Sequence, residues 1–151
     1  MNSDDLIYSD SVFNKQQQQT ISAIANAMIR KDEVLDLPSA SDPLVMKTIL
    51  DKSAHFSDRL VAGIDTLCEE IDPLTSTPEA LLGALDKNPK FRALSRTLTI
   101  IIMQSYYQDP RVLSAHGQSA RPPFPLGHDV ESGDWSLLDQ VKQRKPFYRH
   151  A

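Results

Sequence analysis

The sequence predicts an all-α protein: a small helical bundle followed by a proline-rich tail. Its ten prolines outnumber its five glycines, and aromatic residues make up only 7% of the chain. This balance favours helices that stop at prolines over a sandwich or barrel with glycine-rich turns. Apolar residues also recur every three or four positions, which is the period of a helix face. A chain of 151 residues is long enough for one domain with its own core.

The first helix is predicted over residues 14–31, after an N-terminal segment (1–12) that is expected to be disordered. One face of this helix would carry Ile21, Ile24, Ala25, Met28 and Ile29. The run Gln16 to Gln19 could instead be a disordered glutamine tract. Glutamine is a good helix former, however, and the run leads directly into the periodic part.

A loop over residues 32–42 ends at Asp42 and Pro43, an N-cap followed by a proline that suits the first helical position. The second helix is therefore predicted over 43–71, either continuous or bent where Ser53 to His55 interrupt its pattern. Its apolar stripe would consist of Leu44, Leu50, Phe56, Leu60, Ile64, Leu67 and Ile71.

Three further cap-plus-proline pairs predict three more helix starts: Thr77-Pro78, Asn88-Pro89 and Asp109-Pro110. The third and fourth helices would bury Leu81, Leu82, Leu85, Phe91, Leu94, Leu98, Ile101 and Ile102. The fourth is expected to be the central helix, because Ile100 to Ile102 make it apolar almost all round. The Asp109-Pro110 pair predicts one more turn, which Gly117 ends.

Residues 1–117 are thus predicted to form the helical bundle, and residues 118–151 an extended, partner-binding tail. The tail contains four prolines and shows no sustained period, yet it holds the only tryptophan of the chain. Disordered linkers are usually poor in aromatic residues. The tail is therefore expected to lie on a surface, either that of a partner or that of its own bundle.

Charge and hydropathy exclude two classes of partner. The net charge is −4 and the pI about 5.5, whereas nucleic-acid binding needs Lys and Arg to neutralise phosphates. The basic cluster Lys142, Arg144, Lys145 and Arg149 is interpreted as a solvated tail. The longest apolar stretch, Leu98 to Met103, is far shorter than the roughly 20 residues that span a bilayer. With no export signal visible at the N-terminus, a cytoplasmic location is expected.

No catalytic, cofactor-binding or metal-binding residue is predicted. The four histidines form neither an HxxxH nor an HExxH pattern, and a metal pair of His116 and His128 would need loop geometry that the sequence does not specify. Neither a GxSxG elbow nor a phosphate-binding glycine loop is present. The single cysteine, Cys68, falls in the apolar pattern of the second helix, which favours a buried thiol.

Four segments in this order resemble a known family. They are the Phe13 to Ile29 helix with its F-x-Q and I-x-A-I-A-x-x-M-I pattern, LPSASD (Leu37 to Asp42), NPKFRALSRTLTIIIMQSYYQDPRV (Asn88 to Val112) and RPPFPLGHDV (Arg121 to Val130). The chain resembles the gluconate 2-dehydrogenase subunit 3 family, the small subunits of flavin-dependent sugar and alcohol dehydrogenases. The resemblance covers most of residues 13–130, and the SYYQDPRV stretch with the following PFPLG is its most specific part.

The resemblance implies a non-catalytic accessory subunit that binds and stabilises a large dehydrogenase of the glucose–methanol–choline type. FAD would be held by that partner and not by this chain. Many members of the family carry a twin-arginine signal, which is not visible here, so the pair would work in the cytoplasm or be exported by a signal located elsewhere. The last residues, Trp135 to Ala151, extend beyond the family pattern, and the resemblance assigns them no role.

Aromatic and large apolar residues near the end of the bundle and in the tail are the candidate partner contacts: Tyr106, Tyr107, Phe124, Trp135, Leu138 and Tyr148. Tyr106 and Tyr107 could instead cap the core of the bundle. Two other functions remain open. One is an independent helical adaptor or inhibitor, and the other is a small enzyme that uses a histidine or Cys68 in an unrecognised pocket.

Overall fold

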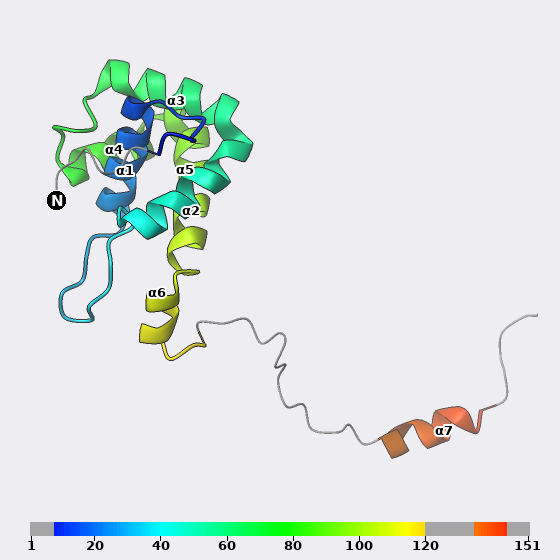
Figure 1. Cartoon of the computed structure of the whole chain (residues 1–151). Coiled ribbons are helices and arrows are strands. Elements are labelled where there is room, and N and C mark those ends of the chain that lie inside the picture. The colour runs from blue at the N-terminus through cyan, green and yellow to red at the C-terminus, as the bar shows by residue number, and fades with distance from the viewer. Residues whose placement is uncertain (1–7, 120–134, 145–151) are drawn as a thin grey trace, which may run out of the picture. The chain divides into compact units, whose positions relative to one another are not determined.

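The computed structural model of the chain describes residues 8–119 and 135–144 (Figure 1). Residues Met1–Arg121 form one compact unit and Pro122–Ala151 a second one, so each unit is described by itself. The regular secondary structure of the described residues consists of helices, with one isolated β-bridge between Asp32 and Leu37 in a loop. The predicted all-α fold is confirmed.

The first helix, α1 (Lys15–Met28), begins with a capping box made by Asn14 and Gln17. The Gln17 backbone N–H donates to Asn14 Oδ1 over 2.9 Å, and the Asn14 N–H donates to Gln17 Oε1 over 3.1 Å. These reciprocal bonds satisfy N–H groups that the start of a helix would otherwise leave unpaired. The helix ends before the predicted residue 31, because the backbone is already extended at Ile29.

Two members of the glutamine run are buried inside the bundle. Gln17 Nε2 donates to Asp65 Oδ1 over 3.0 Å, and Gln18 Nε2 donates to the Phe13 carbonyl over 2.8 Å. Because these amides have hydrogen-bond partners, their removal from water is compensated. The run is therefore a packed part of α1, and the alternative of a disordered glutamine tract is wrong.

The predicted second helix is divided at the position where its pattern weakens. It consists of α2 (Pro43–Ser53), a 3₁₀ turn η2 (Ala54–Phe56) and α3 (Ser57–Glu70). The bend is therefore confirmed. Asp42 caps α2 as predicted, since its Oδ1 accepts a hydrogen bond from the Leu44 N–H over 3.0 Å.

Leu44 and Phe56, two members of the predicted apolar stripe, are exposed instead of buried. Positions 44 and 50 lie about 120° apart around an α-helix, so they cannot both face the same core. The Phe56 side chain belongs to η2, whose tighter winding interrupts the stripe that α3 resumes. The face that α2 buries consists of Val45, Met46, Ile49, Leu50 and Ser53.

The next helix, α4 (Pro78–Lys87), starts as predicted at Thr77, whose Oγ1 accepts a hydrogen bond from the Ala80 N–H over 3.2 Å. The Asn88-Pro89 pair begins the 3₁₀ turn η3 (Pro89–Phe91), which leads directly into α5 (Arg92–Tyr106).

Asp109 then caps α6 (Pro110–Ala115). Gly117 follows with a φ of 71°, a left-handed conformation that favours glycine. The ending predicted at this glycine is confirmed.

Helix α5 lies at the centre of the bundle, because it packs against α2, α3 and α4, while α1 packs against α3 and α4. The predicted core residues of the third and fourth helices are buried, apart from Leu82, which is partly buried. At the α3–α5 contact, a Cβ added to Gly63 would lie 3.2 Å from Leu94 Cβ, so the glycine permits the close approach. The predicted central position of α5 is confirmed, although Ile100, one of the apolar residues on which the prediction rested, is exposed.

The described part of the second unit is a 3₁₀ turn, η4 (Trp135–Leu138), followed by the short helix α7 (Asp139–Lys142). The sequence predicts an extended tail, but the backbone of these residues is helical. The remainder of the tail, 120–134 and 145–151, lies outside the described residues. None of the described helices combines the length and apolarity that crossing a bilayer requires.

Candidate functional site

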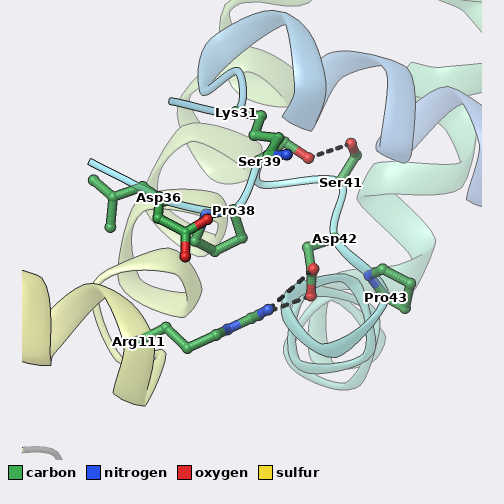
Figure 2. Close-up of a pocket in the computed structure, with 9 residues that line it drawn as sticks. Lys31, Asp36, Pro38, Ser39, Ser41, Asp42, Pro43 and Arg111 are labelled. Carbon is green, nitrogen blue, oxygen red and sulfur yellow. Dashed lines mark hydrogen bonds and ion pairs between the residues drawn. The ribbon is translucent and has the colours of Figure 1, made fainter. Parts of the chain in front are cut away.

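A hollow of about 510 Å³ lies beside the loop that joins α1 to α2 (Figure 2). The loop supplies most of its wall, and Lys31, Pro43 and Arg111 complete it. The same loop extends away from the helices (Figure 1). The same hydrogen bonds and ion pairs hold both the hollow and the loop.

The outer part of the loop is a tight turn closed by the Asp32–Leu37 bridge. The Asp32 N–H donates to the Leu37 carbonyl over 3.1 Å, and the Leu37 N–H donates back to the Asp32 carbonyl over 2.9 Å. Asp32 Oδ1 also accepts hydrogen bonds from the N–H groups of Val34 and Leu35, over 2.9 and 3.1 Å. Asp36 has a φ of 50°, in the left-handed region that aspartate tolerates better than most residues. The turn is thus fixed by its own backbone and by one carboxylate.

The inner part of the loop is tied to the bundle at three points. The Tyr106 hydroxyl on α5 donates to the Pro38 carbonyl over 3.1 Å, and the Ala40 N–H donates to the Ile29 carbonyl over 2.9 Å. The side chain of Leu37 is buried against the core. Burial raises the pKa of the Tyr106 hydroxyl above its ordinary value, so it remains a donor to Pro38 at neutral pH.

Arg111 on α6 joins the N-caps of two helices. It makes a bidentate pair with Asp42, at 3.1 and 2.8 Å, and its Nε and one terminal nitrogen reach Asp109 at 2.9 and 2.8 Å. Figure 2 shows the guanidinium pointing from α6 toward the start of α2. The hydrogen bonds from Arg111 lower the pKa of both carboxyl groups, and the two carboxylates raise the pKa of Arg111.

These contacts define what the hollow can do chemically. The guanidinium of Arg111 is already bonded to two carboxylates, so it is not available to hold a substrate anion. The hydroxyls of Ser39 and Ser41 lie 2.9 Å apart, and Ser41 donates to Asn26 Oδ1 over 3.2 Å. Among the described residues, no histidine or cysteine lines the hollow to activate either serine. The arrangement is therefore a clamp that fixes the loop between α2, α5 and α6.

Two sets of apolar side chains remain exposed on the first unit. Val34 and Leu35, at the tip of the turn, are 93% and 60% exposed. Ile100, Met103 and Tyr107 are also exposed, and their spacing of three and then four residues places them on one outer face of α5. Val34 and Leu35 form the turn tip, and Ile100, Met103 and Tyr107 form the α5 outer face.

The sequence-predicted contact residues occupy different environments. Tyr106 is only 4% exposed, so it is a core residue here and could reach a partner only by leaving the core. Tyr107 is exposed and packs edge-on against Tyr106, with ring centres 5.4 Å apart. Trp135 and Leu138 are exposed in the second unit. Phe124 and Tyr148 lie outside the described residues.

The residues considered for metal binding or catalysis do not come together where they are described. No cluster of potential metal ligands occurs in residues 8–119 or 135–144. His116 lies beside the Tyr107 ring, His55 is exposed, and His128 lies outside the described residues. Cys68 is half-buried on α3, with its Sγ 3.5 Å from Thr20 Oγ1 on α1.

Sequence reasoning missed the turn tip and Arg111. The signal for the tip was present, because two large apolar residues stand between acidic ones in a segment predicted to be a loop. The role of Arg111 depends on Asp42, which is 69 positions away in the chain, so no local pattern could indicate it. Comparisons of the chain with protein-family models, with curated proteins and with solved structures find no match.

Proposed function

We propose that this chain is a non-catalytic accessory subunit that binds and stabilises a large FAD-dependent sugar or alcohol dehydrogenase. The observation that supports binding is the exposure of large apolar side chains in contiguous sets on a folded bundle. Isolated exposed apolar residues are ordinary on soluble proteins, but grouped ones mark interaction surfaces. Methionine and aromatic residues, both present on the α5 outer face, are enriched at such surfaces.

The class of the partner is supported by the resemblance of the Asn88 to Val112 stretch, which forms η3, α5 and the start of α6. In this proposal FAD and the reacting groups belong to the large subunit. Binding buries apolar surface of the small chain and of the large subunit that would otherwise be exposed to water. It acts in the cytoplasm, or is exported together with the partner if the partner carries the export signal.

The second unit is proposed to take part in the same interface. Trp135, Leu138 and Val141 are exposed large apolar residues on one short helical segment. Tryptophan is among the residues that contribute most strongly to binding when buried at an interface. Truncation after Gly117 should therefore leave a helical bundle, seen by circular dichroism, but abolish partner binding. Normal binding by the truncated chain would remove the tail from the interface.

The experiment that tests the function is a native pull-down of the full-length chain from its own cells, with the flavin absorbance of the eluate recorded. A stoichiometric large flavoprotein supports the accessory-subunit proposal. A colourless eluate that contains another protein supports the alternative, an independent helical adaptor or inhibitor. The same exposed surfaces would then serve a partner of a different class.

A further inference from the structure

The turn tip combines two properties that a surface loop rarely combines: large apolar side chains at its most exposed position and a fixed backbone. Val34 is almost fully exposed, and Leu35 beside it is more than half exposed. Loop tips are usually polar, because water contacts them from several sides. The exposure of both residues therefore indicates a surface that becomes buried in contact with something else.

The backbone of the turn is already held in the shape that a partner would meet. Asp32 fixes the tip through two N–H bonds and the bridge to Leu37, and Tyr106 holds the base through the Pro38 carbonyl. A segment that is ordered before binding loses less conformational entropy on binding than a flexible loop does. The turn can thus present its two apolar side chains to a matching pocket without rearrangement.

The carboxylates around the turn tip indicate which kind of surface it can bind. Glu33 and Asp36 are exposed on either side of the two apolar residues, and Asp32 adds a third carboxylate at the base. Anionic lipid headgroups and nucleic-acid phosphates would be repelled by these carboxylates. Two copies of the chain meeting tip to tip would bring like charges together. A protein pocket with an apolar floor and a basic rim complements both features.

We propose that the Asp32–Leu37 turn is the anchor of this chain, inserting Val34 and Leu35 into an apolar pocket rimmed by Lys or Arg on its partner protein. The inference rests on the proposed function only in requiring a protein partner. It does not require that the partner contain flavin. The turn is a separate contact from the tail and is joined to the bundle through the Arg111 and Tyr106 contacts described above.

The first experiment places a photo-crosslinking phenylalanine derivative at position 34 of the full-length chain in its own cells. A second chain carries the same group at position 74, where Leu74 is exposed on a different loop. Irradiation should give a covalent adduct with a larger protein from position 34 and not from position 74. The absence of an adduct at position 34, or an adduct with lipid or with a second copy of the chain, would overturn the proposal.

The second experiment measures how much partner the chain retains. Val34→Ser with Leu35→Ser should lower the retained partner about tenfold or more, because two desolvated anchors are lost. Leu74→Ser should retain the wild-type amount. Circular dichroism should be unchanged in all variants, since every changed side chain is exposed. Wild-type retention by the double variant would show that the tip is not the anchor, even if the partner is a flavoprotein.

The third experiment tests the basic rim. Glu33→Gln with Asp36→Asn keeps the shape of both side chains, and asparagine tolerates the left-handed backbone at position 36. This variant should bind more weakly at low salt and should respond less to added salt than the wild type. Glu69→Gln with Asp86→Asn, changed at exposed positions of α3 and α4, is the matched control. An unchanged salt dependence in the first variant would exclude the basic rim.

A wild-type eluate that contains a partner without flavin would contradict only the proposed function. The crosslink and the binding of the variants can still be measured with that colourless partner. Conversely, a flavoprotein that binds all variants equally would support the proposed function and overturn the anchor. The two failures are therefore distinguishable in one series of pull-downs.

Discussion

The bundle helices and the short helical segment Trp135–Lys142 place their apolar side chains in opposite environments. In the bundle, the inner faces of α1 to α5 are buried against one another. In the second unit, Trp135, Leu138 and Val141 are exposed. Helices in proteins are stabilised mainly by packing of their apolar face. The comparison shows that large apolar side chains form a core in the first unit and an accessible surface in the described part of the second.

Helix starts in the two regions follow two patterns. Asn14, Asp42, Thr77 and Asp109 each accept a backbone N–H from the first turn of a bundle helix. The helices that continue directly from a 3₁₀ turn, α3 and α5 in the bundle and α7 in the second unit, begin without a side-chain cap. Local caps thus mark the bundle helices that begin after a loop, whereas packing distinguishes α3 and α5 from the equally uncapped α7.

The sharpest test of the comparison uses two isoleucines of α5. Ile102 is fully buried and Ile100 is 47% exposed. Ile102→Ala should lower the free energy of unfolding by about 2–5 kcal/mol, because it removes buried methyl groups and leaves a cavity. Ile100→Ala should change it by only about 0.5 kcal/mol. Urea unfolding followed by circular dichroism measures both, and equal effects would contradict the central position of α5.

The next largest effect is expected at the Arg111 clamp. Arg111→Ala should cost about 1–3 kcal/mol, because the nearly buried carboxylate of Asp109 would lose its charged hydrogen-bond donor. Urea unfolding at neutral pH measures this loss. Arg96→Ala, at an exposed position of α5, is the control and should have little effect.

The clamp also predicts a pH dependence. Folding lowers the pKa of Asp42 and Asp109 below their ordinary value of 3.8. The stability that this contributes is complete above the ordinary pKa and is lost as the pH falls through the lower folded values. The wild type should therefore lose more stability than Arg111→Ala between neutral pH and about pH 3. Parallel losses in the two proteins would contradict this role for the clamp.

A smaller effect is expected at a helix cap. Thr77→Ala should cost about 1 kcal/mol, because the Ala80 N–H would lose its acceptor at the start of α4. Thr99→Ala changes the same residue type at an exposed position within α5 and should be close to neutral. The difference between the two unfolding free energies measures the cap. No difference would mean that packing alone specifies the start of α4.

The smallest effect on stability is expected at Trp135. Because its side chain is 72% exposed, Trp135→Ala should leave the unfolding free energy unchanged to about 0.5 kcal/mol. If the tail contacts the partner, the same variant should retain less of it in the pull-down. Since Trp135 is the only tryptophan of this chain, the difference in emission between the complexes of the wild type and of Trp135→Ala isolates its signal, which should lie at shorter wavelength than in the free chain. A constant emission with partner bound would place this residue outside the interface.

Local signals predicted the bundle well, and the failures have physical reasons. Asp42, Thr77 and Asp109 marked helix starts to the residue, because a cap is set by neighbours in the chain. Helix geometry excludes Leu44 and Leu50 from one common face, but which of them is buried is decided by the packing of α2 against α5. The ion pair between Arg111 and Asp42 depends on tertiary structure alone. A helix cap can therefore be predicted from neighbouring residues, whereas the buried face of a helix and an ion pair between distant residues depend on the folded structure.

The single cysteine gives the bundle a built-in chemical reporter. Cys68 on α3 faces Thr20 on α1 and is only half-buried. Since α1 covers one side of the thiol, a bulky thiol reagent should react with it more slowly in the folded chain than in the unfolded chain. A change in this rate therefore reports a local change in the contact between α1 and α3. Because no other thiol is present in the sequence, this seam can be followed in the natural chain without an engineered label.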